Sequence, residues 1–391
     1  MKVSFPRMGY SHLAFRWLFE EIGLEAIVPP EPNNETLDLG VRYSPEFACI
    51  PFKVLMGTYL QAAEMGAEMI ITSGGCGPCR AGYYWVMHQK LLDEIGLKVK
   101  IVGFEEPQNN YFDFVRKLNL VRKAGGVSIA HYWRSIKTAW EKIKALDDCE
   151  IFSYQVRPYE ANRGDTGRAL QQSLELIDQA NDLPQLEKAR LEALQILEEV
   201  PRAEDRDPLK VGIIGEIYVL LEPSINHYMQ KMLGDMGVKA ERSIYLSSYA
   251  RENILAEGEQ DVRLAARPYL NESCIGGHGT NSIGETVLYA NHGYDGVIQL
   301  APFSCIPEIV ARSILPRVSR ELDIPVLTFF LDEQTSKAGV ETRLEAFIDL
   351  LEKRREKKRG TKGASLITLP AGRSKGELLP NLDVVVDNKA L

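Results

Sequence analysis

The sequence predicts an α/β protein with two parallel-sheet domains joined by a helical segment. Two observations favour this class. Short apolar runs alternate with helical patterns near both ends of the chain, and such alternation is typical of parallel sheets. Between these regions, residues 109–200 carry helical patterns with interleaved charges. We therefore expect a sheet domain, a helical connection and a second sheet domain.

The first domain is expected over residues 1–108. Residues 2–6 form a short apolar run that predicts a strand, and residues 11–23 have a mixed apolar helical face. Residues 24–29 are interpreted as a second strand and residues 51–66 as a helix. The next strand is expected at residues 68–72, where a compact apolar run ends abruptly at glycines and cysteines.

The helical connecting region is expected over residues 109–206. Its last helix, at residues 183–200, has leucines at 186, 191, 194 and 197 on a charged background. This amphipathic pattern is too short for a long coiled coil and indicates a helix that packs on a domain. Residues 201–208 (PRAEDRDP) are polar and bounded by prolines, so a domain boundary is placed there.

The second sheet domain is expected over residues 207–352. It begins with a strand at residues 210–215, continues with a helix that ends at Gly234 or Gly237, and then has a strand at residues 239–246. A later apolar run at residues 326–331 predicts another strand. Periodicity fades after residue 351, and residues 353–391 are interpreted as a basic tail that begins as a solvated helix end.

The two sheet domains show signs of an internal repeat. Residues 66–76 (GAEMIITSGGC) and 293–305 (GYDGVIQLAPFSC) share a glycine, an acidic residue, an apolar strand, a break of small residues and a cysteine. Residues 48–51 (ACIP) and 304–307 (SCIP) share Cys-Ile-Pro. We interpret these matches as a distant two-fold repeat of Rossmann-like units, with a chance match as the alternative.

Composition excludes several classes of protein. The chain has 391 residues, with 46 Lys and Arg against 54 Asp and Glu, so its formal net charge is −8. Nucleic-acid binders usually carry a basic face, so no nucleic-acid partner is expected. No run approaches the ~20 apolar residues of a membrane helix, and the first residues lack the apolar segment of a secretion signal. We expect a cytoplasmic protein with no membrane partner.

Cysteines are the strongest local signal. Six in a chain of this length are too sparse for a disulfide framework, and the cytosol would keep them reduced. Cys76 and Cys79 form a CxxC pair beyond the carboxyl end of a predicted strand, where open α/β sheets bind ligands. Two thiolates at this spacing can turn towards one metal atom or cluster. A thioredoxin-like redox pair, half of a zinc site and a coincidence are the alternatives.

Cys49 and Cys305 both stand directly before Ile-Pro, a context that fits the first turn of a helix. A helix N-terminus stabilises a thiolate or a bound anionic cluster. If the two repeats pack face to face, these cysteines lie with Cys76 and Cys79 near one cleft, and four soft thiolates suit iron–sulfur or zinc. We therefore expect a metal cluster at the domain interface. An inert buried thiol is the alternative for Cys49 or Cys305 taken singly.

The remaining histidine and cysteine candidates are less defined. Cys274 and His278 lie in a glycine-rich stretch that is able to approach the same cleft, and the sequence leaves open whether either is a ligand. A backbone role is an equal alternative for His278. Cys149 lies in an acidic stretch and is interpreted as uninvolved.

Few other residues point to chemistry. No P-loop pattern is present, and Gly212 and Gly215 do not complete a dinucleotide-binding GxGxxG. Arg80 and Arg343 are candidates for neutralising the charge of a cluster, with a surface salt bridge as the alternative for each. Residues 332–334 (DEQ) follow a predicted strand and are expected to hydrogen-bond across the domain interface.

Taken together, five segments resemble the acyl-CoA dehydratase activase-related proteins. These proteins are similar to the iron–sulfur subunits of 2-hydroxyacyl-CoA dehydratases and to double-cubane cluster proteins. The segments are residues 44–53 (SPEFACIPFK), 74–84 (GGCGPCRAGYY), 276–279 (GGHG), 301–309 (APFSCIPEI) and 332–347, which begins with DEQ and ends with TRLEAF.

The resemblance implies two Rossmann-like domains with a cubane-type cluster between them, held by Cys49, Cys76, Cys79 and Cys305. A 4Fe–4S cluster fits four ligands, and an 8Fe–9S double cubane would need more. The resemblance also implies a separate ATPase of the actin/Hsp70-like fold that delivers low-potential electrons, and a homodimer or a heterodimer with a related subunit. No ATPase segment and no CoA-binding pocket is identified in this sequence.

The leading hypothesis is therefore an iron–sulfur protein in ATP-dependent low-potential electron transfer, acting as a reductase or dehydratase-like component. A structural zinc protein or cluster-assembly protein without redox catalysis is the alternative. A thiol enzyme that uses the CxxC pair is a third hypothesis. The sequence does not define the substrate, and no catalytic residue is assigned.

Overall fold

The computed structural model describes residues 1–75, 78–203, 205–254, 260–270 and 275–364. Met1–Leu351 forms one compact unit, and the described residues 352–364 lie outside it. Cys76 and Cys274 lie outside the described residues. None of the helices described is both long and apolar enough to span a membrane. The domain boundaries expected within the compact unit stay a prediction. This unit consists of an N-terminal half, a helical segment and a C-terminal half.

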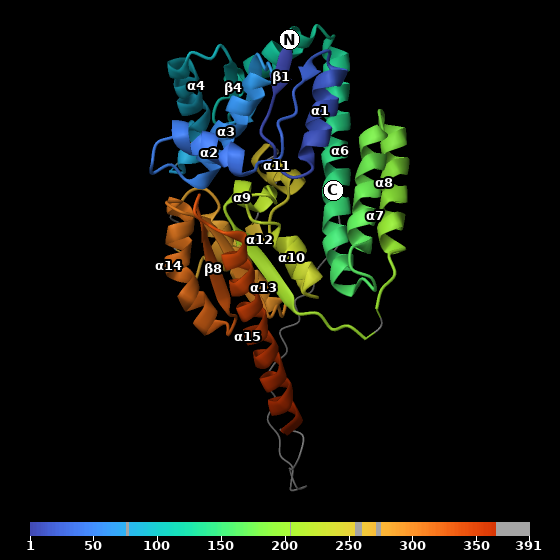
Figure 1. The fold of residues 1–391 in the computed structure, drawn as a ribbon, viewed down its shortest axis with the longest axis vertical. Helices are drawn as coiled ribbons and strands as arrows, with labels where there is room; N and C mark the ends of the chain where they lie inside the picture. The colour runs from blue at the N-terminus through green and yellow to red at the C-terminus, as the bar shows by residue number, and fades with distance from the viewer. Residues whose placement is uncertain (76–77, 204, 255–259, 271–274, 365–391) are drawn as a thin grey trace, which may run out of the picture. The chain divides into compact units, whose positions relative to one another are not determined.

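The N-terminal half is a four-stranded parallel sheet in the order β2-β1-β3-β4. Helices follow the strands in alternation (Figure 1). The strands are β1 (Lys2–Ser4), β2 (Glu25–Ala26), β3 (Met69–Ser73) and β4 (Lys100–Phe104). The helices are α1 (Ser11–Glu21), α2 (Asn34–Tyr43), α3 (Ile50–Glu64), the short 3₁₀ turn η1 (Arg80–Tyr83) and α4 (Tyr84–Ile95).

The C-terminal half is a second four-stranded parallel sheet, in the order β6-β5-β7-β8. Its strands are β5 (Lys210–Gly215), β6 (Lys239–Arg242), β7 (Gly296–Pro302) and β8 (Val326–Leu331). Its helices are α9 (Ile217–Leu221), α10 (Met229–Asp235), α11 (Leu246–Ile254), α12 (Gln260–Ala266), α13 (Gly279–Asn291), α14 (Ile306–Glu321) and α15 (Lys337–Ala364).

The two sheets share one topology, because in each the strand order is second, first, third, fourth along the chain. The interpretation as two Rossmann-like units therefore agrees with the observed fold. One matched segment is nevertheless not equivalent in position. Cys49 precedes the helix before the third strand of its sheet, whereas Cys305 follows the third strand of its own. The shared Cys-Ile-Pro reflects two helix starts with proline in the first turn, a local feature that recurs at many helix N-termini.

Three elements differ from the sequence prediction. Strand β6 covers only Lys239–Arg242 of the strand expected at residues 239–246, and Leu246 already begins α11. Strand β2 covers only Glu25–Ala26, within the longer strand expected at residues 24–29. The helix expected after β5 is two helices, because α9 ends at Leu221 and α10 begins at Met229. Pro223 lies between them and lacks the N–H that a continuous helix would need.

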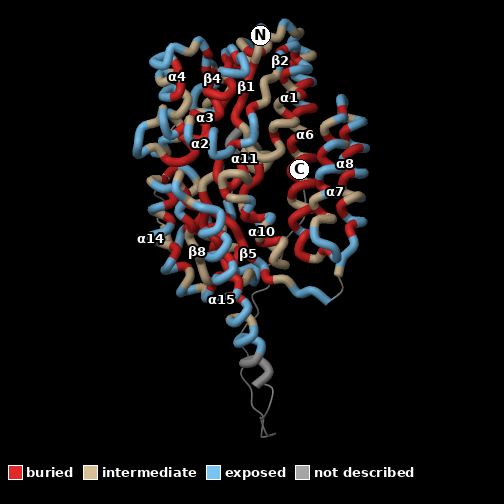
Figure 2. The backbone as a smooth tube through the Cα atoms, viewed as in Figure 1, coloured by how far each residue is buried: buried red, intermediate tan, exposed pale blue. Residues whose placement is uncertain are grey.

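The helical segment consists of α5 (Tyr111–Gly125), α6 (Ile129–Val156), α7 (Asp165–Gln179) and α8 (Leu183–Glu198). Helices α6, α7 and α8 pack on one another around a core that also includes Ala14 of α1 (Figure 1). The expected leucine face of α8 is confirmed in part, since Leu186 and Leu197 are buried while Leu191 is exposed. Figure 2 shows the exposed outer faces of α7 and α8.

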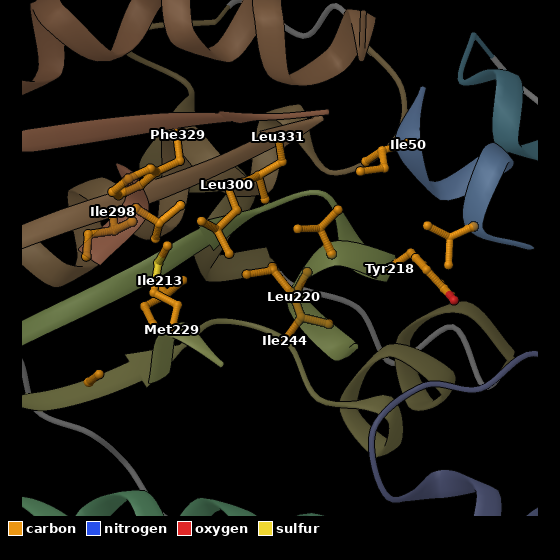
Figure 3. Close-up of a cluster of buried hydrophobic side chains, with 14 of the residues drawn as sticks. Ile50, Ile213, Tyr218, Leu220, Met229, Ile244, Ile298, Leu300, Phe329 and Leu331 are labelled. Atoms are coloured by element: carbon orange, nitrogen blue, oxygen red, sulfur yellow. The ribbon is translucent and has the colours of Figure 1, made fainter. Parts of the chain in front are cut away.

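One continuous cluster of buried apolar side chains joins the two sheets. Figure 3 shows part of it, with Ile50 of α3 together with Leu300 and Leu331 from the C-terminal half. A polar contact crosses the same junction, where Lys53 of α3 lies 2.9 Å from a carboxylate oxygen of Glu333. This contact confirms, for Glu333, the expected bonding of residues 332–334 across the two sheet regions. The halves therefore share both apolar and ionic contacts.

Candidate functional site

Three cysteines begin helices at the junction of the two sheets. Cys49 occupies the N-cap of α3, Cys305 the N-cap of α14, and Cys79 the position before η1. Cys79 and Cys305 follow β3 and β7, so both lie beyond the carboxyl ends of their strands. The fourth predicted ligand, Cys76, lies outside the described residues. The structure thus brings loops from the two halves to one place.

Arg80 ties these three loops together. Its Nη1 donates to the carbonyl oxygen of Phe47 at 3.1 Å, and its Nη2 donates to the carbonyl oxygen of Ser304 at 2.9 Å. The Ser304 hydroxyl also donates to the Phe47 carbonyl, at 3.1 Å. Because these residues adjoin or lie near Cys79, Cys49 and Cys305 in the chain, one guanidinium connects the three cysteine loops.

The Gly-Gly-His-Gly loop packs against the same place. A Cβ atom at Gly276 would lie 3.1 Å from the backbone nitrogen of Cys79. A Cβ atom at Gly277 would lie 3.6 Å from Cys79 Sγ and 3.0 Å from Pro307 Cγ, and Gly277 has a positive φ of 49°. Glycine therefore permits both the backbone conformation and the close approach to the cysteine loop.

A cavity of about 440 Å³ adjoins two of the cysteines. A volume of this size lies within the range of small-molecule pockets, ~300–1,000 Å³. Its wall is mostly apolar and aromatic, and its polar side-chain groups are two thiols, two tyrosine hydroxyls and one guanidinium. The lining residues are Pro45, Phe47, Ala48, Cys49, Phe52, Pro78, Cys79, Arg80, Tyr83, Tyr84 and Met87. Tyr84 also contacts Cys49, because its hydroxyl and the thiol sulfur form a hydrogen bond.

Burial raises the pKa of all three thiols, because an apolar surrounding disfavours the thiolate. The charge of Cys79 further raises the pKa of Cys49, and that of Cys49 further raises the pKa of Cys305. Arg80 acts in the opposite direction on Cys49 and Cys79. The three sulfurs therefore influence one another, and without a cation they favour the neutral thiol.

Two carboxyl groups at the site were missed by sequence reasoning. Glu216 directly follows β5, accepts a hydrogen bond from the backbone nitrogen of Val219 at 3.1 Å, and has a pKa that burial raises to about 7. Its charge raises the pKa of all three described site thiols. Its position at the carboxyl end of a strand was a usable signal.

Glu308 lies in the first turn of α14, three residues after Cys305, and is fully buried. It accepts hydrogen bonds from the Ser282 hydroxyl at 3.0 Å and from Gln299 Nε2 at 2.8 Å. Burial raises its pKa to about 7. This network links α13, β7 and α14 behind Cys305, and it fixes the start of the helix that Cys305 caps.

His278 is the N-cap residue of α13. Its Nδ1 is buried and has no hydrogen-bond partner within the described part of the chain. Burial lowers the pKa of the imidazole to about 4, so the ring is neutral near pH 7. Its ring centroid lies 5.7 Å from that of Tyr249. A neutral imidazole with an unpartnered ring nitrogen retains a lone pair for a ligand.

The other candidate residues from the sequence lie away from the three cysteine loops or outside the described residues. Cys149 is buried in the core of α6 to α8, where burial raises its pKa to about 12, in keeping with the expectation that it is uninvolved. Arg343 donates to the Thr328 carbonyl at 2.7 Å and packs on the ring of Phe329. Cys274 falls outside the described residues.

The donor chemistry of the site fits a thiophilic metal group. Buried thiols favour the neutral form, and a bound cation would stabilise the thiolates that serve as ligands. Cys49, Cys79 and Cys305 are the described residues that would hold such a group. Within the ranges that the structure describes, no three His, Cys, Asp or Glu residues form a group that could hold a metal ion. The fit therefore rests on donor type and on the loops that bring these cysteines together.

Comparison with known proteins adds no relative. No protein-family model matches the chain, and no curated protein sequence matches it. The function of the site must therefore be argued from the residues and their arrangement, together with the motifs described above.

Proposed function

We propose that the chain is an iron–sulfur protein of ATP-dependent, low-potential electron transfer. The observation that carries the proposal is the meeting of the Cys49, Cys79 and Cys305 loops, tied by Arg80, at the junction of two parallel sheets. Cys76 completes the expected ligand set from the CxxC motif. The motif set also supports a 4Fe–4S cluster, with an 8Fe–9S double cubane as the larger alternative.

Each half contributes residues to the proposed site. Cys49 and Cys79 come from the N-terminal half and Cys305 from the C-terminal half. Backbone N–H groups of Ala81 and Glu308 lower the pKa of Cys79 and Cys305, and thereby favour the thiolate forms that bind metal. When bound, an iron–sulfur cluster supplies one-electron chemistry at a potential set by ligation, hydrogen bonds and burial.

A partner must deliver the electrons in this proposal. A separate ATPase activator of the actin/Hsp70-like fold is the partner that the motif resemblance suggests, and a dimer is the suggested assembly. Three exposed aromatic residues support docking of a partner beside the cysteines. They are Phe47, Tyr83 and Phe303, with exposed fractions of 74%, 71% and 58%, and they lie near Cys49, Cys79 and Cys305 in the chain. Exposed apolar groups of this kind are typical of protein interaction sites.

The competing thiol-enzyme hypothesis finds less support. A nucleophilic cysteine needs a lowered pKa, whereas burial raises the pKa of Cys49, Cys79 and Cys305. A structural zinc protein or cluster-assembly protein would use the same thiols without redox catalysis. Analysis of the bound metal distinguishes these alternatives from the proposed function.

The test is purification without oxygen, with iron, sulfide and zinc measured per chain and a visible spectrum recorded before and after a strong reductant. We expect about four iron and four sulfide, with absorption that bleaches on reduction. About eight iron would favour the double cubane. Stoichiometric zinc without sulfide, in protein never exposed to air, would overturn the redox proposal.

A further inference from the structure

The two halves present different side chains at equivalent helix starts. Helix α3 leads into β3, the third strand of the N-terminal half, and Cys49 is its N-cap. Helix α13 leads into β7, the third strand of the C-terminal half, and His278 is its N-cap. By position in the repeat, His278 is therefore the counterpart of Cys49.

Helix packing supports this equivalence. Gly57 of α3 allows the backbone of α2 to approach, since a Cβ there would lie 1.8 Å from the Thr36 carbonyl oxygen. Gly284 of α13 does the same for α12, with a Cβ that would lie 2.1 Å from the Val262 carbonyl oxygen. Each of the two helices thus contributes one glycine to a close contact with the helix that precedes it.

The loop that carries His278 reaches the cysteine site. Gly277, its direct neighbour, lies against both Cys79 Sγ and Pro307, the second residue of the helix that Cys305 caps. His278 is therefore held next to loops from both halves. This placement depends on backbone contacts of the glycines and not on the titration of any group.

The imidazole also has an unused donor atom. His278 Nδ1 is buried and lacks a hydrogen-bond partner in the described part of the chain. A buried polar atom without a partner is unfavourable in a folded protein, so such atoms usually indicate an ion, a water molecule or a ligand. Among these, a metal ion suits a neutral imidazole on a loop whose glycine contacts a cysteine.

We propose that His278 is a further ligand of the metal group at the cysteine site, bound through Nδ1. The C-terminal half then contributes one thiolate and one imidazole, where the N-terminal half contributes thiolates alone. This inference rests on the proposed function, because it requires the site to hold iron and sulfide.

An imidazole ligand changes the properties of a cluster in a definite direction. It is neutral where a thiolate is negative, so its presence lowers the negative charge of the cluster and raises its reduction potential. A cluster with one histidine ligand would therefore be easier to reduce than the same cluster with cysteine in its place. His278→Cys is the variant that makes this comparison within one site.

The first test uses the unaltered chain, purified without oxygen, reduced, and examined by pulsed electron paramagnetic resonance. One sample has natural histidine and the other has histidine labelled with ¹⁵N. We expect a nitrogen coupling to the cluster that changes with the label. An identical signal in both samples would overturn the inference while leaving the proposed function intact. Protein without iron and sulfide would overturn both.

Variants then identify which histidine is responsible. His278→Cys should keep the iron, lose the labelled nitrogen coupling and show a lower reduction potential. His292→Ala is the matched control, because His292 is the C-cap at the opposite end of α13. It should retain the coupling and the potential of the unaltered chain. Retention of the coupling in His278→Cys would contradict the assignment, and this variant preserves a ligand should His278→Ala fail to fold.

Discussion

The N-terminal and C-terminal halves share a scaffold but differ in the chemistry of their loops. Both have four parallel strands in the same order, and both pack the helix before the third strand through a glycine. The N-terminal half contributes Cys49, Cys79 and all the residues that line the cavity. The C-terminal half contributes Cys305, His278 and the carboxyl groups of Glu216 and Glu308.

The side chains that differ at the site lie on segments beyond the carboxyl ends of the strands and at helix N-termini. Strands and helix packing set the positions of these segments, while the residues within them set the donor atoms. Repetition of a scaffold therefore does not require repetition of ligands. Matched substitutions in the two halves, and substitutions at contacts between the halves, test how far their equivalence extends.

The largest expected effect is on helix packing. Gly57→Ala places a Cβ against the Thr36 carbonyl and Gly284→Ala places one against the Val262 carbonyl, so each forces a helix pair apart. We expect both to destabilise the fold by about 3 kcal/mol, with Gly57→Ala the more severe because its approach is closer. Chemical denaturation measures this.

Gly167→Ala is the control for the glycine pair. It lies in α7, and the nearest atom to its Cβ would be Arg157 Nη2 at 3.9 Å. Alanine in a helix with free space should stabilise by about 0.5–1 kcal/mol. An unfolding midpoint for Gly57→Ala equal to that of the unaltered protein would show that α2 and α3 are not in backbone contact.

The ion pair between the halves should give a smaller effect. Lys53 is 3% exposed, and its partner Glu333 has a side chain that is 31% exposed. Glu333→Gln leaves a buried ammonium without its counter-charge, and we expect a loss of about 2 kcal/mol, reduced from the fully buried case because water reaches Glu333. Adding Lys53→Met should recover most of that loss. A double-mutant cycle measures the coupling, and additive effects would argue against a contact between the halves.

The helical segment is fastened to the C-terminal half by a titratable group. Asp147 of α6 accepts a hydrogen bond from the Ser247 nitrogen at 2.7 Å, and burial raises its pKa to about 6. In the unfolded chain the pKa of Asp is about 3.9, so the folded chain binds more protons between these values. This group therefore makes the fold less stable as pH rises from about 4 to 6.

Asp147→Asn should remove that part of the pH dependence. Relative to the unaltered protein, the variant should gain stability as pH rises through this window, by up to about 3 kcal/mol, and show a constant difference above it. Thermal or denaturant unfolding at a series of pH values tests this. A constant difference across the whole window would mean that Asp147 titrates normally in the folded protein.

The smallest effect on stability should come from Arg80. Arg80→Ala removes hydrogen bonds to the Phe47 and Ser304 carbonyls, at an expected cost of about 1 kcal/mol. Loss of the tie should speed the release of iron to a chelator several-fold. Arg343→Ala is the control, because that guanidinium bonds Thr328 and packs on Phe329 instead. Equal rates of iron release in the two variants would show that Arg80 does not help to hold the metal site.

Much of the fold could be predicted because its strands are short apolar runs with clear ends. Strands β3, β5, β7 and β8 all lie where such runs predict them. Strand β2 was overextended, since an apolar run does not show how many residues find a neighbouring strand to pair with. The break at Pro223 was missed, although proline carries a recognisable physical signal.

The site was predictable where residue type alone points to chemistry. Cys49, Cys79 and Cys305 were expected from spacing and motif, and their loops meet. Glu216 and Glu308 were missed because a carboxyl group becomes unusual only through burial, which one sequence does not display. The shared Cys-Ile-Pro also matched Cys49 with Cys305. By position in the fold, the counterpart of Cys49 is His278, at the start of the helix before the third strand.

The central claim is that both halves hold one iron–sulfur cluster together. Its most direct test is Mössbauer spectroscopy of ⁵⁷Fe-grown protein, purified without oxygen, as Cys305→Ala and as the control Cys149→Ala, whose cysteine lies in the core of the helical segment. We expect one cluster of about four iron in the control and its loss or conversion in Cys305→Ala, with the fold retained by circular dichroism. An unchanged cluster in Cys305→Ala would contradict the account, because the N-terminal half would then hold the iron alone.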